Sequence, residues 1–129
     1  MSRDDVVFDS SVLLAYLLNE AGSEILAFVI DRAVMSAVNL AEVRTRLEDL
    51  GAKAQASGNL ALQLIRRIEP FDEADAVATA DLRKKTSFAG LSLGDRACLA
   101  LALKLGADVY TADRHWATVQ VGCRIHMIR

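Results

Sequence analysis

The chain has 129 residues, of which 53% are hydrophobic and 5% aromatic, and its formal net charge at pH 7 is −2. This length and hydrophobic content match one ordinary domain with an aliphatic core, so we expect a single domain over residues 1–129. The slightly negative charge excludes binding of nucleic acid through a global positive field, and the scarcity of aromatic residues argues against base stacking. Any contact with nucleic acid must be local or mediated by a metal.

The two cysteines and the apolar segments bear on cofactors and location. Cys98 and Cys123 lie far apart and outside any CxxC pair, so we expect buried thiols and no zinc site. The apolar run at 12–18 has no basic segment before it and no cleavage site after it. No uncharged stretch approaches the roughly 20 residues that cross a bilayer. We expect a soluble, cytoplasmic protein that does not associate with membranes.

Short runs rich in valine and isoleucine alternate with longer helical patterns, which is typical of an α/β domain with a parallel sheet. Strands are predicted at 6–8, 33–35, 68–71, 108–111 and 124–128, the third either as a strand or as an extended connection. Helices are predicted at 12–17, 23–30, 39–50, 58–67, 72–85 and 93–105. The helix at 93–105 is apolar on almost every side, which indicates a central, buried position.

Four acidic residues fall in the same structural context, just after a strand or in the first turn of the next helix: Asp9, Glu42, Asp95 and Asp113. In a parallel α/β sheet these positions share the carboxyl edge, so residues distant in sequence converge there. Gathered carboxylates repel one another unless a divalent cation neutralises them. Hard oxygen ligands favour Mg²⁺ or Mn²⁺ over zinc, and such a site suits phosphodiester hydrolysis.

Each acid also has a purely structural interpretation. Asn39-x-x-Glu42 and Ser92-x-x-Asp95 both fit the capping-box pattern, in which an acid reaches back to the start of its own helix. The first and last acids could equally be N-caps stabilised by the helix dipole. Asp95 opens an almost wholly apolar helix, so its carboxylate needs a cap, a cation or both.

Four segments carry a family resemblance: VFDSSVL at 7–13, SAVNLAEV at 36–43, LGDRACLA at 93–100 and TADR at 111–114. In this order they resemble a PIN domain, particularly the VapC-type toxins of bacterial toxin–antitoxin pairs, over nearly the whole chain. The resemblance implies a three-layer α/β/α fold with a central, mainly parallel sheet. It also implies that Asp9, Glu42 and Asp95 are the core metal-binding and catalytic acids, with Asp113 as a fourth, more variable member.

The same resemblance implies an Mg²⁺- or Mn²⁺-dependent endoribonuclease that cleaves RNA, forms a homodimer and is blocked by a cognate antitoxin. Ser10 and Thr111 take positions where the family places small polar residues that orient a carboxylate or a bound water. Arg96 is a departure from the commonest pattern. We interpret Arg96 and Arg114 as candidate contacts to RNA phosphates, with a solvated helix face as the alternative for each.

Other functions remain open at this point. The alternatives are a non-catalytic PIN-fold interaction module, and a PIN nuclease with an RNA-processing role other than that of a toxin. A haloacid-dehalogenase-like enzyme is excluded because Ser11 stands where its second aspartate belongs. His115 has no evident partner and is a weak candidate for a general base. Trp116 is expected to cover the core near the site.

Overall fold

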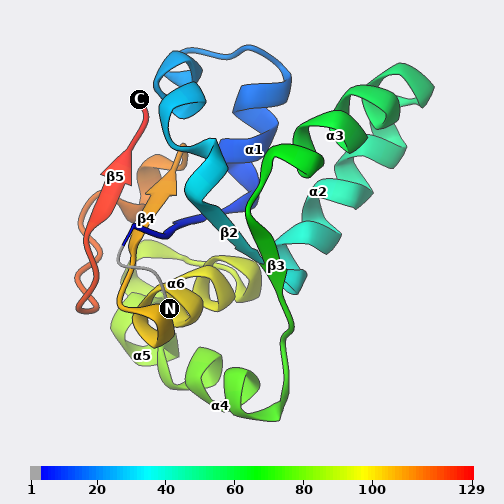
Figure 1. Cartoon of the computed structure of the whole chain (residues 1–129). Helices are drawn as coiled ribbons and strands as arrows, with labels where there is room; N and C mark the ends of the chain where they lie inside the picture. Colours follow the sequence, from blue (N-terminus) through cyan, green and yellow to red (C-terminus); the bar gives the residue numbers. More distant parts are fainter. Residues whose placement is uncertain (1–3) are drawn as a thin grey trace.

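The computed structural model describes residues 4–129 and contains a five-stranded sheet (Figure 1). Its strands are β1 (Val6–Phe8), β2 (Ala33–Ser36), β3 (Arg67–Glu69), β4 (Asp108–Thr111) and β5 (Ile125–Met127). They are hydrogen-bonded in the order β3-β2-β1-β4-β5, and each neighbouring pair is parallel. The prediction of a parallel sheet is confirmed, with β1 as its central strand.

Helices connect the strands on both faces of the sheet. The α-helices are α1 (Ser10–Leu17), α2 (Ala37–Leu50), α3 (Ala52–Leu64), α4 (Glu73–Asp81), α5 (Arg83–Thr86) and α6 (Leu93–Leu105). Short 3₁₀ turns are η1 (Ser23–Phe28), η2 (Ile30–Arg32), η3 (Ser87–Ala89) and η4 (Arg114–Trp116). Within residues 4–129, no helix is long and apolar enough to span a membrane.

Alternation along the central strand divides the core into two layers. Val6 and Phe8 face the side that α1, α2 and α3 cover, whereas Val7 faces the side that α6 covers. Successive side chains of a strand point to opposite faces, so three apolar residues serve both layers. Because both faces of the sheet are covered, the predicted three-layer α/β/α architecture is confirmed.

Three predicted helices differ from those observed. The one at 58–67 belongs to a longer helix, α3, which begins at Ala52 and ends at Leu64. The segment at 23–30 forms the 3₁₀ turns η1 and η2 in place of an α-helix, and Gly22 before it, at φ +88°, supplies no side-chain cap. The helix predicted at 72–85 begins as expected, with Asp72 and Asp75 forming a capping box, but it ends at Asp81. There the buried Leu82 separates it from α5.

A buried carboxylate ties the edge strand β3 to the centre of the sheet. Asp5 is 2% exposed, and its Oδ2 lies 3.0 Å from Nη1 of Arg67. Its Oδ1 lies 3.3 Å from Nε of Arg66, a charge contact without hydrogen-bond geometry. Both arginine side chains keep access to water, whereas the Asp5 side chain has none.

This difference in solvent exposure predicts which substitution lowers the free energy of unfolding more. Replacing both cations in Arg66→Met/Arg67→Met leaves a buried charge unpaired and should destabilise the protein by about 3–5 kcal/mol. Asp5→Asn leaves two arginines that water can solvate, and should cost only about 1–3 kcal/mol. Urea unfolding at pH 7 measures both losses, and a larger loss for Asp5→Asn would contradict this account.

Candidate functional site

Asp9 lies where the central strand β1 meets α1, and it caps that helix. Its Oδ1 accepts hydrogen bonds from Ser11 Oγ at 2.6 Å and from the Val12 amide at 3.1 Å, and its Oδ2 accepts one from Thr111 Oγ1 at 2.9 Å. Burial raises the pKa of Asp9 to about 7 although these hydrogen bonds lower it, and the charge of Asp95 adds to the rise. Asp9 is therefore a buried, tightly held carboxylate that ionises near neutral pH.

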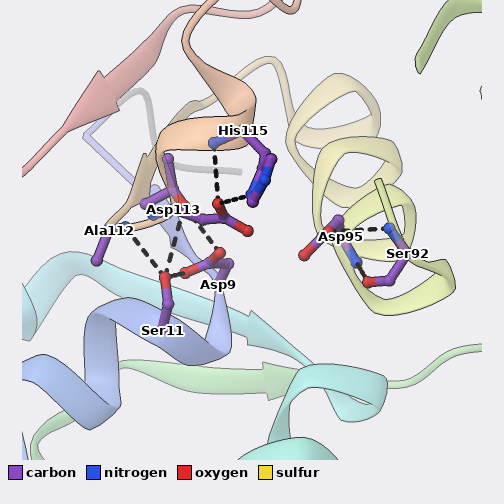
Figure 2. Close-up of polar contacts among 8 residues, drawn as sticks. Asp9, Ser11, Ser92, Asp95, Ala112, Asp113 and His115 are labelled. Atoms are coloured by element: carbon purple, nitrogen blue, oxygen red, sulfur yellow. Dashed lines mark hydrogen bonds and ion pairs between the residues drawn. The ribbon is translucent and has the colours of Figure 1, made fainter. Parts of the chain in front are cut away.

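Two hydroxyl groups join the end of β4 to the start of α1. Ser11 Oγ accepts a hydrogen bond from the Ala112 amide at 3.0 Å, and Thr111 Oγ1 accepts one from the Asp113 amide at 3.0 Å (Figure 2). Thr111 thus contacts the acids, as the resemblance implies. Within the described residues Ser10 forms no hydrogen bond to an acid, and Ser11 takes that role. The spacing from Asp9 to a serine two residues on was the available signal for it.

Asp95 lies in the first turn of α6 and forms the predicted capping box with Ser92. Its Oδ2 accepts a hydrogen bond from the Ser92 amide at 2.9 Å, while Ser92 Oγ accepts one from the Asp95 amide at 3.2 Å. Burial raises the pKa of Asp95, and the negative charges of Asp113 and Glu42 raise it further, against the lowering effect of the bonds from Ser92. The capping box uses one carboxylate oxygen and leaves the other to the site.

Asp113 caps the short turn η4 and is held by His115. Its Oδ1 accepts a hydrogen bond from the His115 amide at 2.9 Å and lies 2.8 Å from Nδ1 of the same residue. Figure 2 shows the side chains of Asp9, Asp95 and Asp113 around one space at the carboxyl edge of the sheet. Trp116 is completely buried, as expected of a residue that covers the core.

Glu42 reaches the same region from α2. Its predicted capping box with Asn39 is wrong, because Ser36 caps α2 by accepting a hydrogen bond from the Val38 amide and Asn39 lies inside the helix. Asn39 Nδ2 instead donates to Glu42 Oε1 at 2.9 Å. The carboxylate rests against Gly94 in the first turn of α6, beside Asp95.

The remaining residues singled out in the sequence differ in their burial. Arg96 is 9% exposed, and its Nη1 donates to the Thr79 carbonyl at 3.2 Å, so it joins α6 to α4. A guanidinium in that position does not suit the phosphate contact predicted for it. Arg114 is exposed beside Asp113. Cys98 is a buried thiol as expected, whereas Cys123 is only partly buried.

The chemistry of the donor set fits a hard divalent cation. All four groups are carboxylates, and Asp95 Oδ1 and Asp113 Oδ2 accept no hydrogen bond from the described residues. Among residues 4–129, no three His, Cys, Asp or Glu side chains stand close enough to form a ready ligand shell. The carboxylates are hard oxygen donors of the kind that divalent cations prefer.

These features define a small α/β/α domain with an acidic site at the carboxyl edge of a parallel sheet. The chain belongs to the PIN domain family, whose model matches residues 6–121. The resemblance carried by the four sequence segments is thereby confirmed at the level of the family. No curated protein sequence matches the chain.

Several solved structures share the fold. VapBC from Salmonella typhimurium bound to DNA is 19% identical with a TM-score of 0.73, covering 97% of this chain and 98% of that one. VapBC2 from Rickettsia felis, bound to a promoter DNA fragment, is 12% identical with a TM-score of 0.75, covering 93% and 96%. Mycobacterium tuberculosis VapC20, a toxin that cleaves the sarcin-ricin loop, is 20% identical with a TM-score of 0.73, covering 93% and 99%. At these identities the likeness establishes a common fold.

The raised pKa of Asp9 predicts a pH dependence of stability in metal-free protein. Since the folded-state pKa of about 7 lies above the ordinary aspartate pKa of 3.8, the protonated form favours folding. That contribution is complete below pH 3.8 and disappears as the pH rises through 7. The quantity to measure is the unfolding free energy of the wild type minus that of Asp9→Asn, in EDTA. As the pH rises from 4 to 8, this difference should fall by a few kcal/mol, on the order expected for such a pKa shift. Urea titrations measure it, and a pH-independent difference would refute it.

Proposed function

We propose that this chain is an endoribonuclease that depends on Mg²⁺ or Mn²⁺, with Asp9, Glu42, Asp95 and Asp113 as metal-binding and catalytic acids. The observation that carries the proposal is the buried Asp9 carboxylate, which shares one space with Asp95 and Asp113 at the carboxyl edge of the sheet. Membership of the PIN family supports nuclease activity. The RNA-cleaving VapC20, which has the same fold, supports RNA as the substrate.

Each part of the site has a distinct task in this proposal. A bound cation would polarise the scissile phosphate and activate a water molecule for attack. Asp9 is oriented by Ser11 and Thr111, so its carboxylate enters the site in one fixed direction. Asp95 and Asp113 each have one carboxylate oxygen that accepts no hydrogen bond from the described residues, and this oxygen would be available to a cation or to its waters. Arg114 is exposed at the rim, where a guanidinium can bind an RNA phosphate.

The direct test is cleavage of single-stranded RNA by purified protein. Cleavage should require Mg²⁺ or Mn²⁺, stop in EDTA, and fall at least about 100-fold in Asp9→Asn, because the amide removes a central negative charge. Asp49→Asn is the matched control, since Asp49 is an exposed acid on the same helix as Glu42. Metal-independent cleavage, or full activity in Asp9→Asn, would contradict the mechanism. If the chain were a non-catalytic interaction module, no divalent metal would support cleavage of the RNA.

We further propose that the chain is the toxin of a toxin–antitoxin pair, acts in the cytoplasm, forms a homodimer, and is inhibited by a cognate antitoxin. The support is the shared fold with proteins solved as VapBC complexes. Induced expression of the wild type in bacteria should arrest growth, whereas expression of Asp9→Asn should not. Co-expression of a small reading frame that lies immediately upstream of the gene should also relieve the arrest. Normal growth on expression of an active nuclease would favour a different RNA-processing role.

A further inference from the structure

Glu42 differs from the other three acids in how it is held. It is exposed on α2, and its carboxylate reaches across to a different helix. Asn39, which is 1% exposed, donates one Nδ2 hydrogen bond to Glu42 Oε1 at 2.9 Å and another to the Gly94 carbonyl at 3.0 Å. A single amide group, using both of its N–H donors, therefore joins the acid on α2 to the first turn of α6.

Gly94 completes this contact by having no side chain. A Cβ at this position would lie 2.3 Å from Glu42 Oε2 and 2.7 Å from Oε1. Gly94 has no positive φ, so its backbone would accept alanine, which is the better helix former. The close approach of the Glu42 carboxylate is therefore the reason for glycine here.

The position also suits the charge of Glu42. The amino end of a helix favours a nearby negative charge, and the first turn of α6 lies directly under this carboxylate. Glu42 contacts Gly94, which directly precedes Asp95 in α6. A group that fixes Glu42 on α6 therefore also fixes its spacing from a second acid of the site.

We propose that Asn39 and Gly94 form a seat for the Glu42 carboxylate, and that Asn39 is a positioning residue that presents Glu42 to the bound metal. The role assigned to Glu42 rests on the proposed function, whereas the existence of the seat does not. Asn39 acts on the metal only through Glu42.

A stability cycle tests the seat without any metal. In the wild-type background Gly94→Ala should lower the melting temperature, because its methyl group meets the Glu42 carboxylate. In the Glu42→Ala background the same substitution should raise the melting temperature by a few degrees, because helix propensity alone then acts. An equal shift in both backgrounds would overturn the seat.

Metal binding tests the positioning role. By calorimetry, Asn39→Ala and Asn39→Leu should each weaken Mn²⁺ binding about 10- to 100-fold, as loss of a residue that orients a metal ligand typically does. Leu is close to Asn in size, but its side chain cannot donate a hydrogen bond and adds no charge. In the Glu42→Ala background, Asn39→Ala should cause no further loss. Leu47→Val is the control, since it loosens the core packing of α2 and should leave Mn²⁺ affinity unchanged.

The outcomes separate this inference from the function on which it builds. If Glu42→Ala weakens Mn²⁺ binding but Asn39→Ala does not, or if Asn39→Ala weakens it equally in both backgrounds, the positioning role is overturned while the nuclease proposal stands. If Glu42→Ala leaves Mn²⁺ affinity unchanged, then Glu42 is not a ligand, and the positioning role and this part of the proposed function both fail. The stability cycle decides on the seat in every case.

Discussion

A carboxylate held in the interior at the end of the central strand is the constraint around which this site is arranged. Asp9 is 2% exposed, and it is held by Ser11, Val12 and Thr111, which belong to both segments that meet at the carboxyl edge. Burial works against the charge of Asp9 and raises its pKa to about 7. The protein therefore maintains a group whose ionised form destabilises the fold, which suggests that a ligand supplies the compensating positive charge.

Helix capping and the proposed function are compatible at this site. Asp9, Asp95 and Asp113 each cap a helix or turn through hydrogen bonds from nearby backbone amides. Those bonds fix the direction of each side chain, and in Asp95 and Asp113 they occupy only one of the two carboxylate oxygens. The hydrogen bonds of a cap in this position therefore fix the orientation of a candidate site residue.

The order of strands and helices could be predicted because hydrophobic periodicity and helix-stop residues are local signals. That Asp9, Asp95 and Asp113 approach one edge of the sheet followed from topology, since parallel strands end at one edge. The supporting contacts could not be predicted in this way. Ser11 meets Ala112 across 101 residues and Asn39 meets Gly94 across 55, so both contacts depend on tertiary packing. The burial of Arg96 against Thr79 could not be predicted for the same reason, because it has no signal in the neighbouring sequence.

The proposed function implies that Asp9 gives up a proton when a divalent cation binds, and calorimetry can measure this directly. Mn²⁺ is titrated into the protein at pH 6 in two buffers of different ionisation enthalpy, which reports the number of protons released on binding. With a pKa of about 7, Asp9 is mostly protonated at this pH, so the wild type should release clearly more protons per bound Mn²⁺ than Asp9→Asn. Binding of Mn²⁺ without proton release, or with equal release from both proteins, would contradict the account.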